Sequence, residues 1–464
     1  MILYSLYECL DLKSFLFLIC LLLLLIDLIR HKNPANFPPG LWPLPILGNV
    51  FTDVIYKTVD QLIEKYGNIF SVRNGSDKIV YVSGFKMVKD VLITQGETFT
   101  DCPRGLSFNN GYSWRKQQQF SMKCYFLCGA FKEEQGKNPS TAAHLTFWSN
   151  NAVANVIGSP LFGHRYEYDD VDFQKLLQMS AESVFLTGSV WNQLYDAFPG
   201  IMKWLPGPHQ TIISNYQELA NFLKEKVEQH RQDWDSNNPR DDIDRKNDTK
   251  AGFNIDSLVW CTVDLFEGGT ETTTNTLRWA LFYIIKYPDI QEKVRAEIDQ
   301  VIGSRPPTMF DKANMHYTNA FIHEVLRKAN LVPLNMARTA RKNTTLVGYF
   351  IPKLKEEYCG TVMITNLTSV LYDKHEWETP DTFNPGHFLD SEGQFCRRNA
   401  FFAFSAGKRQ CPGEHLAHME LFILLAILLQ TFRFSPPPGE EPSLEHQVGF
   451  TQAPLPYKLC AHPR

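Results

Sequence analysis

The sequence lacks three features that would point to common classes of protein. Lys and Arg total 46 against 50 Asp and Glu, a formal net charge of −4, whereas nucleic-acid binders are usually basic overall or carry a basic stripe. The ten cysteines form no framework of paired, closely spaced positions, which gives no case for disulfides. No internal repeat is present. We therefore expect no nucleic-acid partner, and any cysteine chemistry must come from the surroundings of one site.

Length and composition are those of a globular protein with a large core. A chain of 464 residues could form about three domains on length alone. Helical patterns dominate residues 172–327 and 413–432, and strand-like runs such as Ile79 to Val82 are short and scattered. The predicted fold class is mainly α with minor β. The polar run from Arg231 to Lys250 is compatible with a domain linker or with a solvated loop inside one domain.

The N-terminus predicts a membrane anchor. Ser14 to Ile29 is almost continuous hydrocarbon, interrupted only by Asp27, and is slightly shorter than the roughly 20 residues that span a bilayer. The basic cluster Arg30, His31 and Lys32 follows, which places the rest of the chain in the cytosol. No small-residue cleavage site follows. An uncleaved anchor at residues 1–30 is therefore favoured over a signal peptide or a buried soluble helix.

A proline-rich segment follows the expected anchor. Asn36 to Asn49 reads N-F-P-P-G-L-W-P-L-P-I-L-G-N, a composition that disfavours both a helix and a central strand. We expect residues 31–49 to form a stiff, extended hinge between the anchor and the remainder of the chain.

One cysteine stands in a distinctive context. Residues 404–413 read F-S-A-G-K-R-Q-C-P-G and run into a stretch that is apolar on most faces, as in a buried core helix. Pro412 fits the first position of that helix. Cys411 would then lie just before the helix N-terminus, where free N–H groups and partial positive charge lower a thiol pKa. The alternative is an ordinary buried thiol near a turn.

The ten-residue segment resembles the haem-binding signature of the cytochrome P-450 family. The matching positions are Phe404, Gly407, Arg409, Cys411 and Gly413. The resemblance implies one large haem-thiolate monooxygenase domain at residues 50–464, with haem b as cofactor and Cys411 as the ligand of its iron. A thiolate opposite bound oxygen favours O–O cleavage. The two glycines would let the backbone approach a large flat group, and Arg409 offers a cation beside it.

A long helix is predicted to begin near residue 253 and to end near Pro288. Gly268 and Gly269, followed by a threonine-rich run, predict a local distortion, with a break between two helices as the alternative. The segment resembles the family's oxygen-binding helix, with Glu271 and Thr272 as catalytic residues. Oxygen insertion consumes two protons, so a carboxylate and a hydroxyl are needed beside the oxygen. Thr272 would hold dioxygen and Glu271 would supply protons.

Further positions acquire roles through the same resemblance. Glu324 and Arg327 are one helical turn apart, a spacing that alone usually marks a weak surface ion pair. In the family this pair joins a basic residue that corresponds to His387, and the triad is structural. Arg338 corresponds to a haem-propionate partner, and Trp114 to a cofactor-binding tryptophan.

The resemblance covers nearly the whole chain. Within the family, the sequence is most similar to vertebrate microsomal family 2, subfamily J. The resemblance implies lipophilic substrates, namely polyunsaturated fatty acids such as arachidonic acid and foreign compounds (xenobiotics). It also implies electrons from NADPH through NADPH–cytochrome reductase, with cytochrome b5 as a further candidate partner. The expected location is the endoplasmic reticulum membrane, in contact with lipid, with the catalytic domain on the cytosolic face. Lys116, Lys123 and Lys408 are candidate reductase contacts, with ordinary solvated lysines as the alternative.

The sequence also departs from the family pattern. Gln118 stands where the family has a propionate-binding arginine, and the stretch from Asp101 to Trp114 is short. Relative to the family pattern, residues are missing after Gly136 and within the polar run, and Leu354 to Cys359 reads as an insertion. Two alternative functions therefore stay open. One is a haem-binding non-enzyme or a poorly folded variant, and the other is a haem-thiolate isomerase of lipid peroxides.

Overall fold

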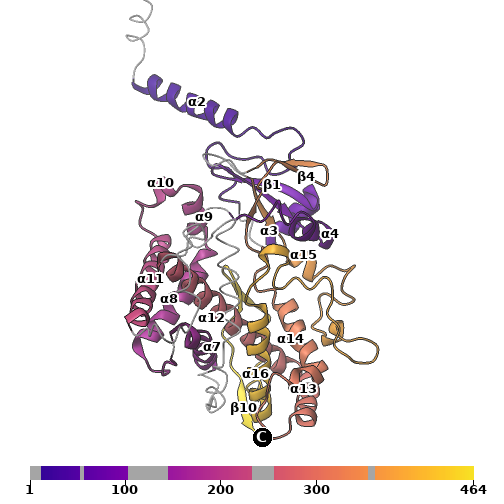
Figure 1. Cartoon of the computed structure of the whole chain (residues 1–464). Coiled ribbons are helices and arrows are strands. Elements are labelled where there is room, and N and C mark those ends of the chain that lie inside the picture. The colour runs from indigo at the N-terminus through magenta and orange to yellow at the C-terminus, as the bar shows by residue number, and fades with distance from the viewer. Residues whose placement is uncertain (1–11, 53–56, 103–144, 163, 233–254, 354–360) are drawn as a thin grey trace, which may run out of the picture.

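The structure, a computed structural model, describes residues 12–52, 57–102, 145–162, 164–232, 255–353 and 361–464 (Figure 1). Its α-helices are α2 (Leu12–Arg30), α3 (Lys57–Tyr66), α4 (Phe85–Lys89), α7 (Leu145–Phe162), α8 (Val171–Thr187), α9 (Val190–Ala197), α10 (Pro199–Met202), α11 (Pro208–Gln232), α12 (Ile255–Lys286), α13 (Pro288–Val301), α14 (His316–Ala329), α15 (Thr368–Leu371) and α16 (Glu414–Thr431). Four short turns of other helix types are η1 (Asp90–Thr94), η5 (Asp311–Asn314), η6 (Pro385–Phe388) and η7 (Gly407–Arg409).

The strands are short, and four of them form the largest sheet. They are β1 (Ile69–Asn74), β2 (Asp77–Val82), β3 (Arg338–Thr339), β4 (Thr344–Leu346), β5 (Tyr349–Ile351), β6 (Thr361–Thr365), β7 (Phe432–Ser435), β8 (His446–Val448), β9 (Gln452–Pro454) and β10 (Cys460–Pro463). The main sheet has the order β1-β2-β6-β3, with β2 and β6 parallel and the other pairs antiparallel. The mainly helical class with a minor sheet component is confirmed.

The helix α12 runs through the middle of the fold (Figure 1) and packs against α7, α11, α14 and α16. The prediction of one long helix is confirmed, and the alternative of a break at the glycines is wrong. Two threonine hydroxyls bond back to carbonyls one turn earlier, Thr272 to Gly268 at 2.6 Å and Thr276 to Thr272 at 2.8 Å. These bonds satisfy the two hydroxyls inside the helix, and back-bonding of this kind often bends a helix slightly. Gly269 permits close packing, because a Cβ there would lie 2.6 Å from the Ile157 side chain in α7.

The buried apolar side chains of the described residues form three groups. The largest joins α12, α13, α14 and α16 with the main sheet, the second joins α7, α8, α11 and α12, and the third lies between α3 and the β1–β2 pair. Because α12 belongs to the first two, helices that precede and follow the polar run share core with the same element. Residues 233–250 of that run lie outside the described residues.

The prediction that the helix after Cys411 is buried is confirmed. In the described part of the chain, α16 is the only helix long and apolar enough to cross a membrane, and 72% of it is buried inside the protein. Burial of that kind is typical of a core helix rather than of a membrane span.

The N-terminal helix α2 exposes apolar side chains along most of its length, including Phe17, Leu22 and Ile29. Its one acidic residue, Asp27, is buried against the first strand, where its carboxylate lies 3.1 Å from the guanidinium of Arg73. The following segment forms no helix or extended strand, as its prolines predict.

Candidate active site

Cys411 lies between the short turn η7 and the helix α16. Its backbone N–H donates to the carbonyl of Phe404 at 3.0 Å, which closes the loop around the cysteine. The helix begins at Glu414 with Gly413 as its N-cap, so the placement of Pro412 at the first helical position is wrong by two residues. The Cys411 side chain keeps an accessible surface, although protein atoms surround it closely enough to desolvate the thiol. The sulfur can therefore be reached by a ligand.

The surroundings of Cys411 do not lower its pKa. Desolvation by the surrounding protein raises the pKa of the thiol to about 11, and the carboxylate of Glu414 adds to the rise. The backbone N–H groups of Gly413 and Glu414 act in the opposite direction, as expected near a helix N-terminus, but desolvation outweighs them. The predicted low pKa is thus wrong for the protein alone. A bound metal cation would supply the missing stabilisation, because coordination deprotonates a thiol.

The remaining signature residues lie in the same loop. Gly407 has a φ of +76°, and a Cβ there would lie 1.9 Å from the carbonyl oxygen of Leu92. Glycine is therefore required at position 407 by the close approach of η1. The sequence instead predicts that this glycine lets the backbone approach a flat ligand. Phe404 is partly buried with its ring 5.3 Å from that of His418. Gly413 has an ordinary φ of −85°.

Two buried arginines, Arg409 and Arg338, lie beside this loop. Arg338 donates to the Arg409 carbonyl at 3.3 Å and lies 3.9 Å from the sulfur of Cys102. Arg409 donates to the Thr100 carbonyl at 2.8 Å. Desolvation lowers the pKa of Arg338, and desolvation together with the Arg338 charge lowers the pKa of Arg409 to about 10. Among the described residues, the polar contacts of Arg338 include no Asp or Glu. The two guanidinium groups lie close enough to influence each other, and the charge of Asp101 acts on Arg409.

Glu271 and Thr272 occupy neighbouring positions on α12. The Thr272 hydroxyl donates to the Gly268 carbonyl, and one Glu271 oxygen accepts from the Asn275 amide at 2.8 Å. Burial raises the pKa of Glu271, opposed by the Asn275 hydrogen bond and by the charge of Arg278. A raised pKa suits a carboxyl group that must carry a proton near neutral pH.

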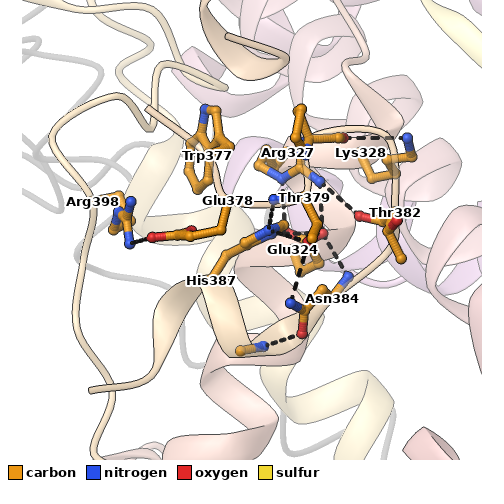
Figure 2. Close-up of polar contacts among 12 residues, drawn as sticks. Glu324, Arg327, Lys328, Trp377, Glu378, Thr379, Thr382, Asn384, His387 and Arg398 are labelled. Carbon is orange, nitrogen blue, oxygen red and sulfur yellow. Dashed lines mark hydrogen bonds and ion pairs between the residues drawn. The ribbon is translucent and has the colours of Figure 1, made fainter. Parts of the chain in front are cut away.

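Glu324, Arg327 and His387 are brought together in a fully buried network (Figure 2). Arg327 donates two parallel bonds of 2.7 Å to the Glu324 carboxylate and further bonds to three backbone carbonyls. The Nδ1 atom of His387 lies 3.2 Å from the same carboxylate. Its Nε2 atom accepts from the backbone N–H of Thr379, so Nδ1 carries the proton toward Glu324. The network joins α14 to η6 and to the segment that precedes it.

Several predicted positions lie outside the described residues, namely Trp114, Lys116, Gln118, Lys123 and the insertion at Leu354 to Cys359. Lys408 is described, and its ammonium group is paired with the carboxylate of Glu97.

Other polar groups near α12 are not among the predicted site residues. Glu267 is buried one turn before Glu271, and Arg278 lies one turn beyond Asn275. Their spacing along one helix was a usable signal. Glu420 on α16 is fully buried as well. Its contact with Thr273 joins two helices that are far apart in the sequence, so no local pattern predicts it.

Comparison with known proteins decides the family. The sequence model of the family described as "Cytochrome P450" matches residues 38–461. The chain belongs to the cytochrome P450 family. It is 41% identical to cytochrome P450 2J5 of Mus musculus over 99% of this chain and 97% of that protein. It is 42% identical to cytochrome P450 2J2 of Homo sapiens over 95% and 94%, respectively. The expected resemblance to subfamily J of family 2 is confirmed.

Membership of the P450 family makes the chain a haem-thiolate monooxygenase in its general function. The residues of the structure fit such a cofactor. An accessible cysteine sulfur can meet the iron, and a buried arginine without a described acidic partner suits the carboxylates of the haem.

Proposed function

We propose that this P450 is an NADPH-dependent monooxygenase whose haem iron is held by Cys411 in a catalytic domain at residues 50–464. The observation that carries the assignment is the Cys411 sulfur itself. It is accessible, and the N–H groups of Gly413 and Glu414 favour its thiolate while desolvation opposes it. Such a sulfur needs a cationic partner in order to be a thiolate at neutral pH.

The other signature residues would hold the prosthetic group from the same side. Arg338 and Arg409 would bind its carboxylates, and Gly407 with Phe404 would shape the loop around the cysteine. When bound, the haem would supply the binding and activation of dioxygen, for which a cysteine ligand is suited. The Glu324–Arg327–His387 network would hold α14 and the segment before η6 in place without touching the reactants.

Thr272 and Glu271 would deliver the protons that the reaction consumes. Insertion of one oxygen atom into a C–H bond uses two electrons and two protons and releases the second oxygen atom as water. The Thr272 hydroxyl would donate at the oxygen, and the Glu271 carboxyl, kept protonated more readily by its raised pKa, would resupply the hydroxyl.

The proposed substrates are lipophilic, with polyunsaturated fatty acids such as arachidonic acid and xenobiotics as the classes that the resemblance to subfamily J implies. Electrons would come from NADPH through NADPH–cytochrome reductase, and cytochrome b5 is a second candidate donor. Lys408 is an exposed cation on the cysteine side, and its pairing with Glu97 means that a reductase carboxylate would have to compete for it.

The reduced, carbon-monoxide-bound difference spectrum of the full-length protein tests the haem assignment. The wild-type chain should give the spectrum of a thiolate-ligated haem, and Cys411→Ser should lose it. Cys396→Ser is the matched control, because Cys396 is another exposed free cysteine and its loss should leave the spectrum unchanged. A Cys411→Ser protein that keeps the spectrum would show that the ligand is elsewhere.

Thr272→Ala tests the proton role and separates monooxygenase from isomerase chemistry. The spectral shift on substrate binding should stay largely unchanged, because an apolar substrate does not need the hydroxyl. NADPH should still be consumed, with a larger share of electrons appearing as hydrogen peroxide. Loss of substrate binding with full coupling would instead make Thr272 part of the pocket wall.

We also propose that residues 1–30 anchor the protein and that residues 31–49 act as the hinge. The structure adds a second apolar surface to the exposed face of α2. Trp42 is 90% exposed and Trp204, after α10, is 79% exposed. Figure 1 shows α2 and α10 at the end of the molecule opposite the C-terminus. Large exposed aromatic side chains are suited to a membrane interface.

Glycosylation tests the proposed cytosolic orientation. Asn343 begins an Asn-Thr-Thr acceptor sequence and its side chain is exposed. Expressed in eukaryotic cells, the protein should carry no glycan at Asn343, because acceptor sites are modified on the lumenal side. A glycan at Asn343 would show that the catalytic domain faces the lumen, and it would leave the haem assignment unaffected.

A further inference from the structure

One face of α12 carries a row of polar side chains that the proposed reaction uses only in part. Glu267, Glu271 and Asn275 are spaced by four residues and therefore lie along the same side of the helix. Two acidic residues at this spacing repel each other when both are charged. A row of this kind in the centre of a protein is costly unless its members share protons or find partners.

Glu267 is the buried member of the row without an assigned role. Its side chain hydrogen-bonds with the hydroxyl of Tyr216 in α11, which also meets the hydroxyl of Thr187 at the end of α8. The titratable groups that face Glu267 are Tyr216 and Glu271. Desolvation raises the pKa of Glu267 to about 7, Glu271 adds to the rise and the Tyr216 hydrogen bond opposes it.

Glu271, one turn further, is held in place from the other end of the row. Asn275 donates to Glu271 at 2.8 Å and accepts from Arg278 at 3.1 Å, and Arg278 also donates to the Pro454 carbonyl in β9 at 2.9 Å. The second carboxylate oxygen of Glu271 has no hydrogen-bond partner among the described residues. Beside it lies a pocket of about 280 Å³ lined by residues of α7, α8, α12 and the β8–β9 segment, with polar groups such as Asn150 and Arg278 and apolar side chains such as Phe185. A partly polar pocket of that size has room for more than one water.

We propose that Glu267 is a proton-relay residue that resupplies Glu271, with Asn275 and Arg278 as positioning residues that aim the Glu271 carboxyl at this pocket. The inference rests on the proposed function. Each proton that leaves Glu271 toward Thr272 is replaced by one from Glu267, through water, and Glu267 recovers its proton from solvent. The relay changes no oxidation state, and all protons come from water.

The variant Glu267→Gln isolates the relay from a purely structural role. Glutamine keeps the shape and an oxygen acceptor for the Tyr216 hydroxyl, but it does not ionise. Glu420→Gln is the matched control. Glu420 is another buried carboxyl group, its pKa is raised well above the ordinary value by desolvation, and it lies on α16 away from the row.

Infrared difference spectroscopy of the protein without haem provides the first readout. A protonated carboxyl band should titrate near pH 7 in the wild-type protein and be lost in Glu267→Gln. In Glu271→Gln its midpoint should move to lower pH, because a neighbouring negative charge has been removed. In Glu420→Gln the titration should be unchanged. If the band survived in Glu267→Gln, or if its midpoint pH were the same in Glu271→Gln as in the wild-type protein, the proposed interaction between the two carboxyl groups would be wrong.

The second readout is the pH profile of coupling in the haem-loaded enzyme with reductase. Glu267→Gln should remove the inflection near pH 7 in product formed per NADPH and increase the solvent deuterium isotope effect, while Glu420→Gln should change neither. If the pH profile and the isotope effect were unchanged in Glu267→Gln, Glu267 would have only a structural role as the hydrogen-bond partner of Tyr216. If the wild-type protein gave no thiolate-type spectrum, the proposed function would fail, whereas the infrared titration would still report on the carboxyl pair.

Discussion

Two buried arginines of this P450, Arg327 and Arg338, have the same chemistry and opposite surroundings. The side chain of Arg327 is fully buried and is satisfied by the chain itself, through a bidentate pair with Glu324 and three backbone carbonyls. Arg338 is 2% exposed, yet its described partners are one carbonyl and one sulfur atom. A buried charge that the chain neutralises is part of the scaffold. A buried charge that it leaves without an acidic partner is suited to an anionic ligand.

Replacing Arg327, the arginine that the chain itself neutralises, should have the largest effect on the stability of the folded protein. Arg327→Leu leaves the Glu324 carboxylate buried without its cation, a change that costs about 3–5 kcal/mol. We expect a large loss of soluble, folded protein and a lower midpoint in thermal unfolding, with or without haem. The control is Arg398→Leu, which removes a partly exposed partner of Glu378 and should cost less than about 1 kcal/mol. Equal losses in the two variants would remove the distinction between scaffold and surface pairs.

Breaking the other arginine should affect the bound cofactor more than the fold. Arg338→Met removes a charge that has no described acidic partner, so thermal unfolding of the haem-free protein should change little. Haem retention should fall by roughly ten- to hundredfold, since a hydrogen bond to a charged group contributes about 1.5–3 kcal/mol. Transfer of haem to a scavenging protein measures this rate, and Arg338→Lys should recover only part of it. Destabilisation of the haem-free protein as severe as in Arg327→Leu would contradict the comparison.

The local parts of this comparison could be predicted from the sequence. Glu324 and Arg327 are one helical turn apart, so helix geometry alone brings their side chains together. The length of α12 and the burial of α16 also follow from local apolar patterns. Family resemblance added His387 and Arg338, which are far from their partners in the sequence and have no local signal.

The remaining features depend on tertiary contacts. The helix terminus predicts a lowered pKa for Cys411, but desolvation by the surrounding protein outweighs the terminus and raises that pKa. The sequence predicts that Gly407 makes room for a ligand, whereas the carbonyl of Leu92 in η1 is the neighbour that requires glycine there. The burial of Asp27 depends on Arg73, 46 residues away. In each case the deciding neighbour comes from another element, which periodicity and motif spacing do not report.

A third kind of buried group, neutral and titratable, sharpens the comparison with the two arginines. His418 in α16 stacks on His323 in α14 with ring centroids 4.5 Å apart, and neither ring nitrogen of His418 has a described hydrogen-bond partner. Desolvation lowers the pKa of His418, and that of His323 to about 3, with the charges of Lys312 and Arg397 acting in the same direction. Both shifts favour the neutral form of the rings in the folded protein.

The smallest predicted effect is the acid sensitivity that these histidines cause. The unfolded chain takes up protons on them below the ordinary pKa of 6.5, whereas the folded chain does not. Stability is therefore fully present above that pH and falls as the pH drops, by about 1.4 kcal/mol per pH unit for each ring that stays neutral. His418→Phe should match the wild-type protein in thermal unfolding at pH 7.5 and exceed it at pH 5.5 by roughly 1 kcal/mol. Replacement of the exposed His375 by Gln should leave the pH dependence unchanged. If His418→Phe lost stability as steeply as the wild-type protein, the folded state would have to accept a proton at this position. The His418 ring would then be a buried cation like Arg338 rather than a neutral core residue.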